Sequence, residues 1–275
     1  MPELPEVETI RRDLAPELEG RTVVGVRVHQ ADILMNLPAE AEAARALEGR
    51  TVERLERRAK YLLFHLSGGA VLEVQLRMTG RFALGERLPD PEEFTHVAAE
   101  LRLDDGRTLW YDDVRRLGGL RLLDEEAWRR READLGPEPL EDDYRPEALG
   151  RELEGRRAPV KNLLMDQRRV AGVGNIYASE ALHAAGLDPR RPGGSLDPRE
   201  VERLHGALRR VLRRALEKAG TTFRDYRAVN GRSGRFQEML AVYGREGEAC
   251  PRCGAEVRRG VQAGRSTFWC PGCQA

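Results

Sequence analysis

The four cysteines of this 275-residue chain all lie within its last 26 residues, in the motifs CPRC at 250–253 and CPGC at 270–273. Two CxxC pairs with this separation are typical of knuckles that hold one zinc ion through four thiolates. Disulfides and redox-active pairs are the alternatives, but two CxxC pairs in so short a tail fit a zinc ribbon better. We therefore predict one structural Zn²⁺, bound by Cys250, Cys253, Cys270 and Cys273.

A second group of reactive side chains stands at the N-terminus, where the chain begins MPELPEVE. Taken alone, this pattern indicates the start of a helix, because proline suits the first helical position. The carboxylates of Glu3 and Glu6 would face the positive end of the helix dipole. Apolar residues recur at helical spacing from Val7 to Leu18, which predicts a helix over about residues 5–18.

A glycine-rich turn occurs in the segment 166–182, DQRRVAGVGNIYASEAL. Gly172 and Gly174 permit a tight backbone turn, and Asn175 stands where a helix cap belongs. A helix N-terminus behind glycines offers N–H groups that can bind a phosphate. The same pattern also describes an ordinary capped corner between two helices, and these residues alone leave both interpretations open.

The charged residues are divided unevenly, although the net charge is zero. Residues 1–150 carry 22 Lys and Arg against 32 Asp and Glu, a balance of −10, and residues 151–275 carry 24 against 14, a balance of +10. This split indicates a polyanion partner for the basic half, or pairing of the two halves with each other. Neither a signal-peptide pattern nor a membrane-length apolar run occurs, so we expect a soluble, cytoplasmic protein.

The elements that must position these residues change in type near residues 136–147, a segment rich in proline, glycine and acidic residues. Before it, short apolar or alternating runs predict an antiparallel β-sandwich, interrupted by a helical insert at about 38–48. The predicted strands are 22–29, 51–56, 61–66, 70–76, 97–103, 108–111 and 119–123. After it, the periodicity predicts helices at about 145–153, 159–166, 175–185 and 197–219. The arginine-rich segment 224–236 is expected to form a mobile loop.

In combination, these features resemble the bacterial formamidopyrimidine-DNA glycosylase family (Fpg or MutM) over essentially the whole chain. The resemblance rests on the PELPEVET start, RRAKYLLF at 57–64, MTG at 78–80, the 166–182 turn, VYGREG at 242–247 and the four cysteines. It implies an α+β fold of two domains. The first is an N-terminal β-sandwich with its helix, and the second is a helical domain with a helix–two-turn–helix and a four-cysteine zinc ribbon. The boundaries we expect are 1–135 for the sandwich, 136–147 for a linker, 148–237 for the helical region and 238–275 for the ribbon.

The resemblance also implies an activity in base excision repair. The enzyme would be a bifunctional DNA glycosylase and AP lyase that excises 8-oxoguanine and formamidopyrimidines from damaged duplex DNA. It would act as a monomer on the DNA of the bacterial nucleoid. Once Met1 is removed, the secondary amine of Pro2 would attack C1′ and form a cationic iminium, which drives β- and δ-elimination. Glu3 would transfer protons, Lys60 would assist elimination, and Arg265 would grip the phosphates at the lesion.

Further residues match the family's DNA-contacting positions. Chemistry on a base requires its removal from the stack, and the family fills the gap with side chains that match Met78, Arg115 and Leu117 here. Glu6 would orient the site, and the remaining DNA contacts would come from His96, Arg157, Lys161 and Asn175. The chain departs from the family pattern at Leu117, where phenylalanine is usual. It also departs at Gln75, Arg77 and Val114, which puts the detailed lesion specificity in doubt.

Three rival interpretations remain, and the first is an enzyme of the same class. The sister enzyme endonuclease VIII shares the proline, the turn and the ribbon but prefers oxidised pyrimidines. The LPEVET stretch and the loop at 224–236 favour the Fpg branch instead. A lesion-binding protein without catalysis would use the same scaffold, but it has no need of a free N-terminal amine. A general zinc-ribbon nucleic-acid module would leave the N-terminal half unexplained.

Overall fold

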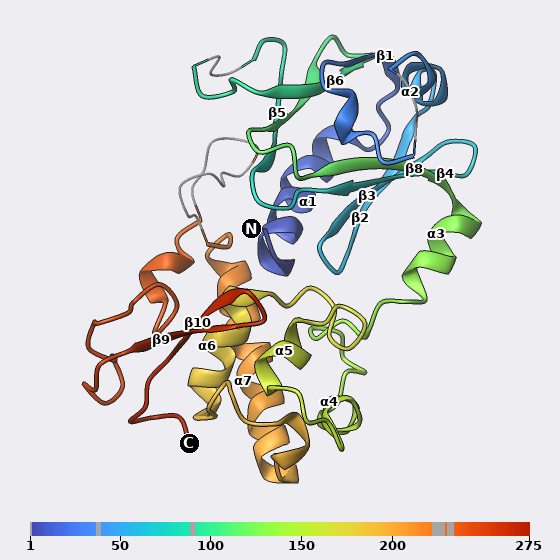
Figure 1. The fold of residues 1–275 in the computed structure, drawn as a ribbon. Coiled ribbons are helices and arrows are strands. Elements are labelled where there is room, and N and C mark those ends of the chain that lie inside the picture. Colours follow the sequence, from blue (N-terminus) through green and yellow to red (C-terminus); the bar gives the residue numbers. More distant parts are fainter. Residues whose placement is uncertain (1, 37–39, 89–91, 222–228, 230–233) are drawn as a thin grey trace. The chain divides into compact units, whose positions relative to one another are not determined.

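The computed structural model describes residues 2–36, 40–88, 92–221, 229 and 234–275 (Figure 1). The chain divides into two compact units. Unit 1 comprises Met1–Ala133 and Ala219–Arg235, and unit 2 comprises Asp134–Lys218 and Phe236–Ala275. Most of the predicted mobile loop at 224–236 lies outside the described residues.

Helix α1 (Leu4–Leu18) opens unit 1 and confirms the helix predicted from the apolar spacing. Its buried stripe includes Val7, Ile10 and Leu14, each fully shielded from solvent. The helix packs against β2 (Val52–Arg58) and β3 (Tyr61–Leu66). The N-terminal residues are therefore held at the end of an element that is anchored in the core.

Two four-stranded sheets form most of the rest of unit 1, and every neighbouring pair of strands is antiparallel. One sheet has the order β1 (Val23–Val28), β6 (Val97–Leu103), β7 (Thr108–Asp113) and β5 (Gly80–Gly85). The other has the order β2, β3, β4 (Ala70–Gln75) and β8 (Gly119–Asp124). Helix α2 (Glu40–Leu47) lies between β1 and β2 in the sequence. The predicted antiparallel sandwich and its helical insert are confirmed.

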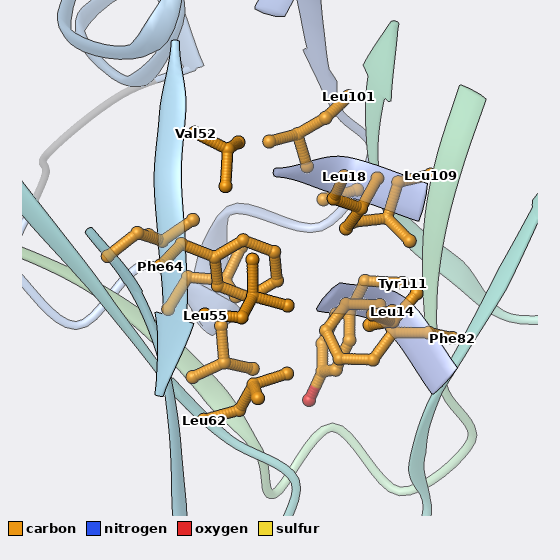
Figure 2. Packing of buried hydrophobic residues seen from close by; sticks show 14 of the residues in the cluster. Leu14, Leu18, Val52, Leu55, Leu62, Phe64, Phe82, Leu101, Leu109 and Tyr111 are labelled. Atoms are coloured by element: carbon orange, nitrogen blue, oxygen red, sulfur yellow. The ribbon is translucent and has the colours of Figure 1, made fainter. Parts of the chain in front are cut away.

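One hydrophobic core fills the space between the two sheets. Figure 2 shows side chains of β2 and β3, among them Leu55 and Phe64, facing Phe82 and Tyr111 of the opposite sheet. Leu14 of α1 belongs to the same cluster. The rings of Phe82 and Tyr111 lie with centroids 5.4 Å apart, a spacing at which tilted aromatic pairs attract each other.

One strand and one α-helix of unit 1 were not predicted. Strand β5 follows a turn and carries Arg81, which is 7% exposed and whose guanidinium Nε donates to the Asp112 carboxylate at 3.0 Å. This buried ion pair breaks the expected apolar alternation. Helix α3 (Glu125–Glu132) has one buried residue, Trp128, and therefore no apolar stripe. Its start is fixed instead by the Asp124 side chain, which accepts from the backbone N–H of Ala127 at 2.7 Å.

Unit 2 is helical and ends in a hairpin. Its main elements are α4 (Pro146–Leu153), α5 (Val160–Met165), α6 (Asn175–Ala185), α7 (Pro198–Glu217), β9 (Arg258–Gln262) and β10 (Arg265–Trp269). The four predicted helices are confirmed within one or two residues at each end. A second core lies among the helices, and a third, smaller cluster includes Cys250, Cys270 and Phe268 of the ribbon. Among the described helices, none is both long and apolar enough to cross a membrane.

Candidate active site, DNA contacts and metal centre

The N-terminal residues are built into the first turn of α1. Pro2 is buried, and Glu3, which is 1% exposed, is the N-cap residue of the helix. The backbone N–H of Glu3 donates to the Glu6 carboxylate at 2.8 Å. This contact is the return half of a capping box, and it fixes the backbone that carries the predicted nucleophile and acid.

The Glu6 carboxylate also binds a segment of unit 1 that is distant in sequence, at residues 220–221. Its second oxygen accepts from the backbone N–H of Thr221 at 2.8 Å. The neighbouring Gly220 has a φ of +80°, and a Cβ added there would lie 2.8 Å from Glu6 Oε1, so this close approach requires glycine. Glu6, itself 1% exposed, therefore joins the start of α1 to residues 220–221.

Lys60 lies in the tight turn between β2 and β3, and its side chain is half-buried. The preceding Ala59 has a φ of +53°, in the left-handed region that costs a non-glycine residue about 1 kcal/mol. The Arg57 guanidinium donates to the Ala59 carbonyl at 3.1 Å and supports this conformation. A side-chain hydrogen bond therefore supports the turn that carries Lys60, and this turn joins the two strands against which α1 packs.

The loop after β7 is tied to the turn before β5 by a buried pair of polar side chains. The Thr79 hydroxyl donates to one oxygen of the Asp113 carboxylate. It also accepts from the backbone N–H of Arg115 at 3.0 Å. The other oxygen of Asp113 accepts from the backbone N–H of Gly118 at 2.7 Å. These bonds fix Met78 and the 114–117 segment relative to one another.

The apolar side chains of these two loops project into solvent. Met78 is 39% exposed and Leu117 is 50% exposed. Val114, one of the departures from the family pattern, is 46% exposed. Large apolar groups held on an ordered, exposed loop are suited to entering a partner rather than to filling this protein's own core. The exposed His96 lies just before β6, and its backbone N–H donates to Asp112 at 2.7 Å.

The remaining departures lie close to the same loops. Gln75, at the end of β4, is 6% exposed, and its side-chain amide donates to the Glu73 carboxylate at 2.8 Å. Arg77 is exposed and has a φ of +51° in the turn that carries Met78.

In unit 2, two predicted DNA contacts converge on the ribbon hairpin. The ammonium of Lys161, which is 1% exposed, donates to the Ser266 carbonyl at 3.0 Å and to the Thr267 hydroxyl at 2.7 Å. The side-chain amide of Asn175 donates to the same Ser266 carbonyl at 3.0 Å. Arg265, the residue before Ser266, is exposed at the start of β10. These contacts place Lys161 and Asn175 where they position the strand that carries Arg265.

The glycine-rich turn before α6 is held by one side chain. Gln167 accepts from the backbone N–H of Gly172 at 2.9 Å and donates to the Val173 carbonyl at 2.8 Å. Gly172 has a φ of +78°. Arg157 lies exposed between α4 and α5. Gln167 therefore fixes the predicted corner, and Arg157 presents its charge at a separate surface position of unit 2.

The four cysteines gather into one cluster, with all sulfur atoms within 4.8 Å of one another. The Sγ atoms of Cys250 and Cys273 are 3.8 Å apart, and those of Cys253 and Cys270 are 3.4 Å apart. A tetrahedral zinc with bonds of about 2.3 Å requires sulfur–sulfur separations of about 3.8 Å. The geometry fits the predicted four-cysteine zinc centre.

The thiol pKa values of Cys253 and Cys273 reflect how close the four sulfur atoms lie. The backbone N–H of Ala255 and the neighbouring thiols lower the pKa of Cys253 to about 7. Burial, together with the other three sulfurs, raises the pKa of Cys273 to about 12. Four thiolates so close together would repel one another, and a bound Zn²⁺ would offset that repulsion.

Two groups of residues escaped the sequence analysis. Thr79 and Asp113 carried no motif beyond ordinary turn chemistry. His183 of α6 lies 67 residues before Cys250, yet its ring Nε2 is 3.3 Å from the Cys250 sulfur. No spacing rule links positions so far apart.

Three models of protein families match the chain. The "Formamidopyrimidine-DNA glycosylase N-terminal domain" matches residues 1–120, and the "Formamidopyrimidine-DNA glycosylase H2TH domain" matches residues 135–226. The "Zinc finger found in FPG and IleRS" matches residues 247–275.

Individual relatives cover the whole chain. The formamidopyrimidine-DNA glycosylase of Chloroflexus aurantiacus is 46% identical over 274 residues, covering 100% of this chain and 98% of the relative. The crystal structure of MutM (Fpg) from Thermus thermophilus is 45% identical with a TM-score of 0.88, covering 99% of this chain and 98% of that chain. A Lactococcus lactis Fpg mutant in complex with a Fapy-dG containing DNA is 33% identical with a TM-score of 0.91, covering 99% of each chain.

Proposed function

The chain belongs to the formamidopyrimidine-DNA glycosylase family, and from this premise we propose its substrate, its mechanism and the residues that carry them. It excises 8-oxoguanine and formamidopyrimidines from duplex DNA and then cleaves the strand by β,δ-elimination. It acts as a monomer in the cytoplasm. The three-part division at residues 1–135, 148–237 and 238–275, with a linker at 136–147, belongs to the same proposal.

The nucleophile is the nitrogen of Pro2 after removal of Met1. Its lone pair forms a bond to C1′ of the damaged nucleotide, while the glycosidic bond breaks and its electron pair leaves with the base. Opening of the sugar ring gives an iminium, which withdraws electrons from C2′ and acidifies its proton. Loss of that proton expels the 3′ phosphate, and a second elimination releases the 5′ side.

Proton transfer is assigned to Glu3, which protonates the sugar ring oxygen and later moves protons during elimination. The observation that supports this assignment most strongly is the buried first turn of α1. There Glu3 is 1% exposed, and its backbone is fixed by Glu6 at 2.8 Å. Glu6 orients the site rather than reacting, because both of its oxygens already accept backbone N–H groups. Lys60 approaches the phosphate and the damaged base from the β2–β3 turn and assists elimination.

The gap left by the flipped nucleotide is filled by Met78, Arg115 and Leu117, on loops that are held together by Thr79. Leucine can wedge between bases as an apolar group, but it stacks less well than an aromatic ring. His96 and Arg157 contribute further DNA contacts. Arg265 binds the phosphates at the lesion. Lys161 and Asn175 contact phosphates beside it, and both also hold its strand through the Ser266 carbonyl.

Zinc serves the structure of the ribbon rather than the chemistry. Four thiolates fill a tetrahedral site, which leaves no open position for a substrate or an activated water. When bound, the ion supplies the folding free energy of the ribbon, whose own apolar cluster is small.

Borohydride trapping tests the proposal directly. Purified protein lacking Met1 is mixed with a duplex that carries one 8-oxoguanine opposite cytosine, and borohydride reduces any iminium to a stable adduct. We expect a covalent protein–DNA adduct that mass spectrometry maps to Pro2. A matched variant, Glu3→Gln, should lose base excision and yet still be trapped on a duplex that already contains an abasic site.

The other outcomes separate the rival functions. An adduct on a thymine glycol duplex, with none on the 8-oxoguanine duplex, would assign the chain to the endonuclease VIII branch. An absence of adduct on either duplex and on an abasic site would favour a lesion-binding protein without catalysis.

A further inference from the structure

A histidine of the helical region reaches the zinc cluster. His183, in the last turn of α6, is 5% exposed, and its Nε2 lies 3.3 Å from the sulfur of Cys250. Cys250 is itself 3% exposed. The contact therefore lies in a shielded environment, where a hydrogen bond is stronger than in water.

The protonation state of the Cys250 sulfur decides which of the two atoms is the hydrogen-bond donor. A zinc-bound cysteine is a thiolate, which has no proton to donate and can only accept. The proton between the two atoms must therefore belong to His183 Nε2. The backbone N–H of Arg252 is a second donor to the same sulfur, at 3.4 Å. Four thiolates around one Zn²⁺ leave an excess of negative charge, and N–H donors disperse it.

Both ends of α6 are bonded to the ribbon. At its first residue, the Asn175 amide donates to Ser266 of the hairpin at 3.0 Å. At its last turn, His183 contacts Cys250 of the first knuckle. Between them, the Glu180 carboxylate, 5% exposed, accepts from the backbone N–H groups of Ala241, Val242 and Tyr243 at 2.8 to 3.0 Å. The helix thus lies along the ribbon as a support for it.

We propose that His183 is a positioning residue of the zinc centre, which donates its Nε2 proton to the Cys250 thiolate and couples zinc retention to α6. The ligand set stays four cysteines. The histidine orients one of them and lowers its tendency to dissociate from the ion, in the way that outer-sphere donors act at other metal sites.

The first test measures zinc release from the full-length, zinc-loaded protein into a chromogenic chelator. His183→Phe keeps an aromatic ring but removes the donor. Loss of such a contact typically costs about 10- to 100-fold in metal affinity, which should appear here as zinc release about 10- to 100-fold faster. His183→Gln keeps a side-chain N–H and should recover most of the retention. His205→Phe is the matched control, because His205 is also a buried histidine of unit 2 but its Nε2 bonds to the Tyr144 carbonyl at 2.8 Å.

A second readout does not depend on any variant being folded. In the zinc-loaded wild-type protein labelled with ¹⁵N at histidine, the His183 ring should carry its proton on Nε2. A lone pair on Nε2 would overturn the proposal. So would a release rate for His183→Phe that matches the His205→Phe control, or equal rates for the Phe and Gln variants of His183.

Discussion

Substitution of Thr79 tests whether its hydroxyl holds together the two exposed loops of unit 1, which carry Met78 and residues 114–117. Thr79→Val removes the hydroxyl but preserves the shape of a side chain that is 5% exposed. Thr79→Ser keeps the hydroxyl and serves as the matched control. We expect the valine variant to remain folded and to excise lesions from duplex DNA far more slowly than the serine variant.

The expected loss of activity can be calculated from the two hydrogen bonds of the Thr79 hydroxyl that the valine variant lacks. The hydroxyl donates to the Asp113 carboxylate, a bond to a charged group worth about 1.5–3 kcal/mol. It also accepts from the Arg115 backbone N–H at 3.0 Å, worth about 0.5–1.5 kcal/mol. Asp113, which is fully buried, keeps its bond from Gly118. We expect the valine variant to spend about 2 kcal/mol of binding free energy on ordering the two loops when it binds DNA. This cost corresponds to a fall in kcat/KM of about 30-fold for a lesion in duplex DNA.

The assay compares two substrates for each variant. Excision of 8-oxoguanine from a duplex requires the gap beside the flipped base to be filled, whereas strand cleavage at an abasic site in single-stranded DNA has no such gap. The valine variant should lose activity on the first substrate and retain it on the second. An equal loss on both substrates, or equal rates for the valine and serine variants, would refute the idea that this hydroxyl organises the intercalating side chains.

Other perturbations give equally direct outcomes. Chelation of zinc should unfold the ribbon, since structural zinc contributes about 10–16 kcal/mol to such domains, and this should appear as a change in the fluorescence of Trp269, which is 8% exposed. Arg265→Gln should weaken DNA binding on all sequences, reduce the salt slope of log Kd by about 1, and let the β-elimination product accumulate on a sequencing gel. Burial lowers the pKa of His205, so the unfolded chain takes up its proton first and stability should fall as the pH drops below about 6.5. Urea denaturation at pH values of about 7.5 and 5.5, on either side of the ordinary histidine pKa of about 6.5, measures this change. The free energy of unfolding should fall between them in the wild-type protein and fall less in His205→Gln.

Periodicity and turn residues predicted most of the fold because most elements bury an apolar face. The predictions failed where another interaction organises the element. Strand β5 buries Arg81 against Asp112, and helix α3 is fixed by its Asp124 cap together with ion pairs such as Glu125–Arg129 at 2.9 Å. Neither produces an apolar pattern in the sequence.

In the candidate site, too, local motifs could be predicted from the sequence, whereas contacts between distant segments could not. The zinc ligands could be predicted because both pairs are local motifs with a fixed geometry. The roles of Pro2 and Lys60 came from the family resemblance, and their chemistry awaits the trapping experiment. Contacts between distant segments, such as Glu6 with Thr221 and His183 with Cys250, could not be predicted, since they depend on how the chain is folded back on itself.

The hydrogen bond between Glu6 and Thr221 affects the order in which the protein can fold during its synthesis. The two residues are separated by 215 positions, and unit 1 is completed only by Ala219–Arg235. A ribosome that adds about 5–20 residues per second needs roughly 10 to 40 seconds to cover that distance. During this interval the first turn of α1 lacks a hydrogen-bond partner that the finished fold provides. The first turn of α1, which carries the proposed nucleophile, therefore gains this contact only after residue 221 has been synthesised.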